Sequence, residues 1–145
     1  MCNESFHQGV LKYIAILGRI CMGLFFVLGG IGMTGGQFAA TALGIEMVGL
    51  PMPRVLTCLT IFIELIAGSM LIIGYKTRYA ASALIGFTVL ATWFFHLPTM
   101  WWSLRDVMGQ VMFMKNLAIV GGLMHIVAYG SCQHENCNRF TDDKK

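Results

Sequence analysis

The chain has 145 residues, of which 57% are hydrophobic and only 12% are charged, and its formal net charge is +3. A soluble domain normally carries about 25% charged residues, so this composition argues against a water-soluble protein and favours a membrane protein. The basic residues are spread along the chain without the clustered patches of a nucleic-acid-binding surface, so we expect no nucleic-acid partner.

Four windows are apolar enough to span a bilayer, whose core of about 30 Å needs roughly 20 apolar residues per helix. They cover residues 13–33, 55–75, 79–97 and 111–130. We therefore predict an all-α integral membrane four-helix bundle over residues 13–130. Residues 1–12 form an N-terminal segment in this prediction, and residues 131–145 form a C-terminal tail.

The first span has some features of a secretory signal, because "ATA" at residues 40–42 resembles a cleavage site. Its apolar run is longer than the usual 7–15 residues of a signal's hydrophobic region, and three more spans follow. We interpret it as a retained helix.

Lysine and arginine in the connections predict the orientation. Two of them, Arg54 and Arg105, lie on one side of a four-span path. Six lie on the other: Lys12, Lys76, Arg78, Arg139, Lys144 and Lys145. Cytoplasmic loops are enriched in these residues, so we expect both termini in the cytoplasm.

Several polar residues fall within the predicted spans and are the candidate site: Arg19, Glu64, His96, Lys115 and Asn116. A lysine near the centre of a transmembrane helix costs roughly 3 kcal/mol on insertion scales, so Lys115 needs an explanation. A rise of about 1.5 Å per residue places Arg19 roughly 8 Å, and Lys115 roughly 3–8 Å, from Glu64 in depth. We therefore expect Glu64 to pair with both cations inside the bundle.

Each of these residues also has a simpler interpretation. Lys115 and Arg19 could extend to the outer and cytoplasmic surfaces, as long cationic side chains do near helix ends. Glu64 is then protonated or faces a wet cavity, because an ionised form facing lipid is unfavourable. Asn116 is expected to form a hydrogen bond between helices. His96 is either a headgroup contact or a proton relay.

Small residues and cysteines complete the sequence pattern. Ser82 with Gly86, and Ala118 with Gly122, lie four apart and predict close helix packing. Near the C-terminus, "CQHENC" is a weak metal-site candidate because it lacks a fourth ligand. Its possible ligands are Cys132, His134 and Cys137. We expect no metal there.

The sequence resembles the DoxX family of small four-helix membrane proteins. The stretches that match are "LGRICMGLFFVLGG", "TIFIELIAGSMLIIGYKTRYAASAL", "ATWFFH" and "FMKNLAIVGGLM", which together cover most of residues 13–130. The matching polar positions are Arg19, Glu64, Arg78, His96, Lys115 and Asn116. The resemblance implies a location in the bacterial inner membrane. It also implies a link to quinone-dependent oxidoreductases, but it brings no established catalytic role.

Three functions follow as hypotheses. The first is a redox-associated subunit that contacts a quinone of the membrane or supports an oxidoreductase partner. The chain shows no dinucleotide loop, paired-histidine haem motif or iron–sulfur cysteine cluster, so electrons would come from that partner, and no enzyme activity is assigned. The second is a binder or transporter of a lipid or a small amphipathic molecule. The third is a structural scaffold, and a homodimer is compatible with all three.

Overall fold

The computed structural model describes residues 2–96 and 107–129, and the side chains of residues 10–95 and 107–129. Every regular element in this part of the chain is helical, which confirms the predicted all-α fold. The elements are α1 (Cys2–Gly32), η1 (Met33–Gln37), α2 (Phe38–Met47), α3 (Pro53–Ile73), α4 (Thr77–Ala91), η2 (Thr92–His96) and α6 (Val107–Tyr129).

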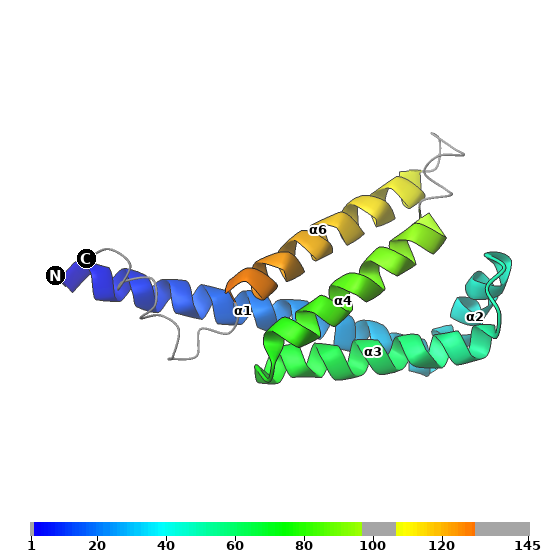
Figure 1. The fold of residues 1–145 in the computed structure, drawn as a ribbon, viewed down its shortest axis with the longest axis horizontal. Coiled ribbons are helices and arrows are strands. Elements are labelled where there is room, and N and C mark those ends of the chain that lie inside the picture. Colours follow the sequence, from blue (N-terminus) through cyan, green and yellow to red (C-terminus); the bar gives the residue numbers. More distant parts are fainter. Residues whose placement is uncertain (1, 97–106, 130–145) are drawn as a thin grey trace.

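Four helical stretches are long and apolar enough to cross a membrane: Val10–Met47, Pro53–Ile73, Thr77–Phe95 and Val107–Tyr129. α1 and α3 run antiparallel, α4 returns beside α3, and α6 returns beside α4 (Figure 1). The start of α1 and the end of α6 therefore lie at one end of the bundle, which we call the terminal end. The opposite end, where α2 lies and where α3 and α6 begin, is the distal end.

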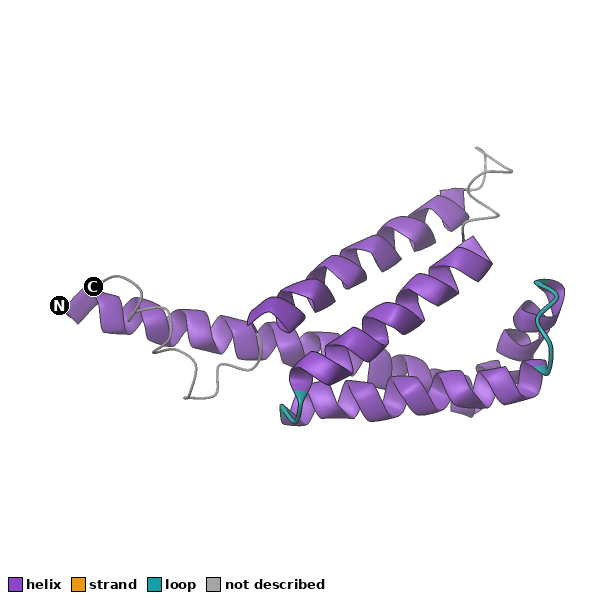
Figure 2. Cartoon of the chain, in the orientation of Figure 1, coloured by secondary structure: helices purple, strands orange, loops and turns teal. Residues whose placement is uncertain are grey.

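Local sequence signals fix the ends of α3 and the short turn that follows it (Figure 2). Pro53 occupies the first turn of α3, where a missing backbone N–H costs nothing. Gly74 ends the helix with φ of 86°, a conformation that a residue without Cβ adopts without strain. Lys76, with φ of 42°, then leads into α4, so α3 and α4 form a tight antiparallel pair.

The chain between the first two spans contains a helix that the sequence prediction treated as an outer connection. Gly36, with φ of 149°, breaks the helical path after α1, and α2 follows it and packs against α3. This segment is rich in alanine, leucine and other good helix formers, which was the available signal.

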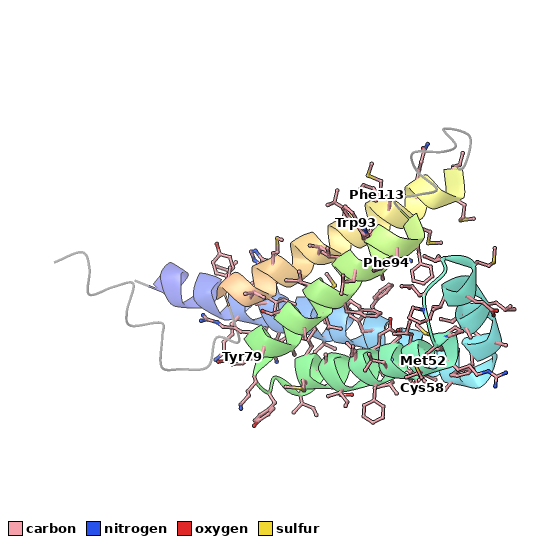
Figure 3. The ribbon with its side chains drawn as sticks, turned by 45° about the vertical axis from the view of Figure 1, so that its right-hand side comes forward. Met52, Cys58, Tyr79, Trp93, Phe94 and Phe113 are labelled. Carbon is pink, nitrogen blue, oxygen red and sulfur yellow. The ribbon has the colours of Figure 1, made fainter. Side chains whose placement is uncertain are left out.

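Aromatic residues mark the two ends of the bundle. The exposed tyrosines Tyr13, Tyr75, Tyr79 and Tyr129 all lie toward the terminal end. Trp93 and Phe94 lie toward the distal end, far from Tyr79 (Figure 3). The amphipathic rings of tyrosine and tryptophan prefer the boundary between lipid and water, so the four tyrosines and Trp93 fit the two membrane surfaces. Trp101 and Trp102 lie outside the described residues.

Helices α1 and α3 touch at two glycines. A Cβ built on Gly23 would lie 2.8 Å from the carbonyl oxygen of Gly68, and one built on Gly68 would lie 3.0 Å from that of Gly23. Small residues allow helix backbones to approach this closely in membranes. Of the pairs predicted to pack, Gly122 does meet Met22, but nothing lies within 4 Å of a Cβ on Gly86. The prediction of close packing at Gly86 is therefore wrong.

All four long helices contribute to one apolar core. Leu71, Leu84 and Leu123, from α3, α4 and α6, are completely buried, and Phe26 of α1 packs with them. The remaining buried members of the core are Ala67, Ala80, Ala81 and Ile119.

Candidate functional site

Glu64 lies midway along α3, and its side chain turns toward α1. Only 8% of its surface is exposed. A Cβ built on Gly29 of α1 would lie 3.1 Å from Glu64 Oε2, and one built on Gly30 would lie 3.5 Å from Glu64 Cβ. The carboxyl group therefore rests against a stretch of α1 that has no side chains to obstruct it. Glu64 Oε2 is buried and has no hydrogen-bond partner among the described residues.

Arg19 lies at the terminal end of α3 rather than beside Glu64. A Cβ on Gly74 would lie 3.0 Å from Arg19 Nη2 and 3.3 Å from Nη1, so the guanidinium group covers the last turn of α3. Gly74 is ten residues beyond Glu64, or about 15 Å along the helix. The carboxyl end of a helix carries a partial negative charge that favours a cation. The end of α3 therefore stabilises the Arg19 guanidinium group at this position without a carboxylate.

Lys115 lies on the surface of the bundle near the α1–α6 contact. Its side chain is exposed, and its Nζ lies 3.3 Å from the sulfur of Met112 and 5.9 Å from the centre of the Phe25 ring. A cation this close to an aromatic face gains about 0.5–2 kcal/mol. The placement fits the alternative in which Lys115 faces lipid and extends toward the membrane surface at the distal end.

The prediction that Glu64 pairs with both cations is wrong. Within residues 10–95 and 107–129, neither Arg19 nor Lys115 reaches its carboxylate. The depth estimate failed because it set the ends of the apolar windows level, whereas Gly29 of α1 lies level with Glu64, and Arg19 is ten residues before Gly29, or about 15 Å toward the terminal end. The helix rotations then turn Glu64 inward and Lys115 outward, and sequence spacing alone did not determine them.

The expected hydrogen bond from Asn116 to another helix is confirmed. Asn116 Nδ2 of α6 donates to Thr92 Oγ1 of η2 at 2.9 Å, and Thr92 Oγ1 donates to the backbone oxygen of Thr88 at 2.6 Å. The hydroxyl group of Thr88 is itself buried without a partner in the described structure. The sequence analysis missed both threonines, although their four-residue spacing in an apolar span was the available signal.

The remaining predicted site residues contribute less. His96 ends η2, but its side chain lies outside the described part of the chain, as do Cys132, His134 and Cys137. Arg78 is exposed at the start of α4. No group of three metal-binding side chains occurs within the described residues.

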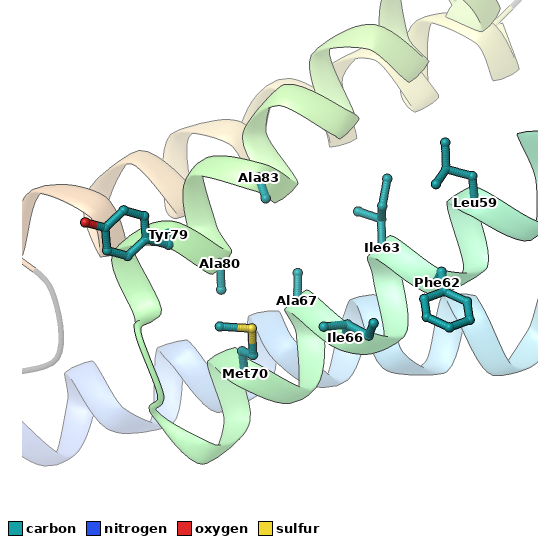
Figure 4. A pocket seen from close by; sticks show the side chains of 9 residues that line it. All are labelled: Leu59, Phe62, Ile63, Ile66, Ala67, Met70, Tyr79, Ala80 and Ala83. Carbon is teal, nitrogen blue, oxygen red and sulfur yellow. The ribbon is translucent and has the colours of Figure 1, made fainter.

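A shallow apolar groove lies between α3 and α4, on the outer surface of the bundle (Figure 4). Its volume is about 330 Å³. It is lined by Leu59, Phe62, Ile63, Ile66, Ala67, Met70, Tyr79, Ala80 and Ala83. Ile63 and Ala67 flank Glu64 along α3, but the carboxyl group itself faces α1, so the groove and the carboxyl group lie on different sides of the same helix.

Comparison with known proteins places the chain in a family. The DoxX family model matches residues 14–97, which is more than half of the chain. The chain belongs to the DoxX family. The match covers α1 through η2, including Arg19 and Glu64, whereas Lys115 and Asn116 lie beyond it.

This DoxX protein also resembles the inner membrane protein YqjF of Escherichia coli (strain K12). The two are 31% identical over 115 residues, a stretch that covers 79% of this chain and 82% of YqjF. No solved structure matches the chain. The sequence relationships and the four apolar helices together establish a multi-pass membrane protein of the DoxX family.

Proposed function

We propose that this DoxX protein is an inner-membrane subunit that contacts a quinone for an oxidoreductase partner, with Glu64 as the polar group of the contact. The observation that carries the proposal is the Glu64 carboxyl group, buried midway along α3 with one oxygen unpartnered among the described residues. A buried polar group without a hydrogen bond costs about 1–3 kcal/mol in proteins, so a ligand that supplies the bond binds with that advantage.

A quinone suits such a group chemically. Its ring and isoprenoid tail are apolar, and its two carbonyl oxygens accept hydrogen bonds from a carboxylic acid. Reduction of a quinone to the quinol takes up two electrons and two protons. A reducing partner protein would supply the electrons, since the sequence has no recognised cofactor motif, and Glu64 would pass protons to the carbonyl oxygens.

The location and orientation belong to the same proposal. YqjF is named as an inner membrane protein, and we propose the same membrane for this chain. The excess of lysine and arginine at the terminal end supports termini in the cytoplasm, so the distal end would face the opposite compartment.

Quinone binding to the purified full chain in lipid nanodiscs tests the proposal. A short-chain quinone is titrated while the quenching of tryptophan fluorescence is measured, since Trp93 lies in η2 at the distal side. Loss of one hydrogen bond of about 1–2 kcal/mol predicts roughly 5- to 30-fold weaker binding for Glu64→Gln. Glu46→Gln is the matched control, because Glu46 is an exposed glutamate on α2. Equal affinities of wild type and Glu64→Gln would refute the role of Glu64.

The apolar groove between α3 and α4 supports a second candidate, a binder of a lipid or another amphipathic molecule. Eight of its nine lining side chains are wholly apolar, and the groove lies between the membrane-spanning helices α3 and α4. Mass spectrometry of molecules that co-purify with the protein separates the candidates. A retained quinone that is lost in Glu64→Gln favours the first function, and a retained phospholipid that is unaffected by this change favours the second.

A scaffold without ligand chemistry makes a different prediction. If Glu64 and Lys115 only maintain the bundle, the combined variant Glu64→Leu with Lys115→Met should keep the function of the wild type. Loss of quinone binding in a variant that still folds would reject the scaffold.

A further inference from the structure

The buried polar side chains of the spans lie level with Glu64 or distal to it, where they accompany the buried apolar residues Ile45 and Ile61, whereas the buried side chains on its terminal side, apart from Thr77, are apolar. Thr57, Glu64 and Thr88 are buried polar residues of the spans, and all three lie at mid-membrane or on its distal side. The hydrogen bond between Asn116 and Thr92 lies on that side as well. Thr77, the remaining buried polar residue of the described chain, belongs to the turn at the terminal end.

The same change occurs on three helices within about one turn. On α3, Glu64 is followed toward the terminal end by buried Ala67 and Leu71. On α4, Thr88 is preceded on that side by the buried residues Leu84, Ala81 and Ala80. On α6, Asn116 is followed by Ile119 and Leu123, both buried.

Helix α1 closes the terminal side of Glu64. Gly29, which faces the carboxyl group, is followed toward the terminal end by buried Phe26. One turn further, the contact between Gly23 and Gly68 brings the α1 and α3 backbones together with no room for a Cβ. Protein interiors packed in this way exclude water, so this side of Glu64 is dry.

Two buried oxygen atoms on the distal side of the apolar residues Phe26, Leu71 and Leu84 have no hydrogen-bond partner among the described residues. Glu64 Oε2 and Thr88 Oγ1 both lack a hydrogen-bond partner within the described structure, and Thr88 is only 5% exposed. Nearly all buried polar atoms in proteins bind another protein atom or an ordered water. On the distal side, Thr57, Thr88 and the Asn116–Thr92 pair are polar groups to which a water could bind, whereas the leucine layer offers none.

The charged side chains on the neighbouring helices do not contact the Glu64 carboxyl group. Arg19, whose Nε is also buried without a hydrogen-bond partner in the described structure, lies about 15 Å away toward the terminal end, beyond the Gly23–Gly68 contact. Lys115 on α6 and Glu46 on α2 are exposed and directed away from the core. On α4 no titratable side chain occurs between Tyr79 and His96, and Tyr79 lines the outer groove.

We propose that Glu64 exchanges protons and water only with the distal side of the membrane, and that the layer of Phe26, Leu71, Leu84 and Leu123 seals it from the terminal side. This sidedness extends the proposed quinone function, because protons delivered to the quinone would come from the distal compartment. That consequence rests on the proposed function. The sidedness itself is measured without any quinone, so the two proposals fail independently.

Cysteine accessibility tests the proposal in the full chain reconstituted in vesicles. The five native cysteines are replaced by alanine, and either Thr88→Cys or Ala81→Cys is introduced on α4. A charged, membrane-impermeant thiol reagent is added to vesicles of each orientation, which a protease-sensitive tag at the N-terminus identifies. We expect Thr88→Cys to be labelled from the distal side and to lose this labelling when the reagent is confined to the terminal side. Ala81→Cys should remain unlabelled from both sides.

Labelling of Ala81→Cys from the terminal side would overturn the proposal. So would equal labelling of Thr88→Cys from both sides, or its complete absence. Size-exclusion profiles and circular dichroism check that each variant folds. If the α4 pair fails this check, Thr57→Cys and Ala67→Cys repeat the comparison on α3, where Thr57 lies distal and Ala67 terminal to Glu64.

Discussion

The contact between Gly23 and Gly68 sets the distance between α1 and α3, and therefore the space in which the Glu64 side chain lies. Replacing Gly23 by alanine would place a Cβ 2.6 Å from Ile72 Cγ1, 2.8 Å from the Gly68 carbonyl oxygen and 3.2 Å from the Ile72 amide nitrogen. Two of these three atoms belong to the backbone, so a change of rotamer cannot relieve the clash. The helices must move apart.

The size of the effect follows from two opposing terms. Overpacking a close contact lowers the free energy of unfolding by about 1–3 kcal/mol. Replacing glycine by alanine within a helix raises it by up to about 1 kcal/mol, because alanine has the higher helix propensity. Because the backbone atoms cannot yield, we expect Gly23→Ala to lower the free energy of unfolding by about 1–2 kcal/mol.

Matched glycines on other helices serve as controls. Nothing lies within 4 Å of a Cβ built on Gly121 of α6 or Gly86 of α4, so alanine there should be neutral or stabilising by up to about 1 kcal/mol. Gly122→Ala should fall between these results, because its Cβ meets only the flexible end of Met22. The order of the variants by their free energy of unfolding is thus a stricter test than the free energy of any single variant.

Reversible unfolding in mixed micelles of a mild detergent and dodecyl sulfate, followed by circular dichroism, measures these differences. The reasoning predicts that Gly23→Ala unfolds at the lowest dodecyl sulfate fraction, with Gly122→Ala next and Gly121→Ala at or above the wild type. A Gly23→Ala variant as stable as Gly121→Ala would show that α1 and α3 are not held together at this point.

Three further predictions concern the polar residues. Gly29→Ala should weaken quinone binding without changing any polar group, because the new Cβ would lie 3.1 Å from Glu64 Oε2; unchanged affinity in the nanodisc titration would contradict this. Asn116→Leu and Thr92→Val should show a coupling energy of about 0.6 kcal/mol and at most about 1.7 kcal/mol, measured by a double-mutant cycle in the same micelles. Arg19→Gln should destabilise the bundle by about 0.3–2 kcal/mol through the carboxyl end of α3, with Arg19→Lys recovering part of the loss; equal stability of all three proteins would exclude this role.

The amino-acid sequence by itself determined the solvent and the class of fold. Four apolar windows of about 20 residues, a low share of charged residues and helix-ending signals such as Pro53 and Gly74 are local properties, and a bilayer allows few structures for such a chain. The sequence also identified Glu64, Lys115 and Asn116 as the polar residues that need an explanation, and it predicted the hydrogen bond of Asn116 to another helix.

Only the tertiary structure decided what each polar side chain faces. A helix must be rotated, tilted and placed in depth before its side chains have neighbours, and packing between helices sets these three quantities. Glu64 faces the glycines of α1 because the Gly23–Gly68 contact allows α1 to come close, and Arg19 reaches Gly74 because this contact also sets which residues of α1 lie level with the end of α3. The position of Thr88 one turn from the buried Leu84 likewise depends on the packing of four helices, which no single segment encodes.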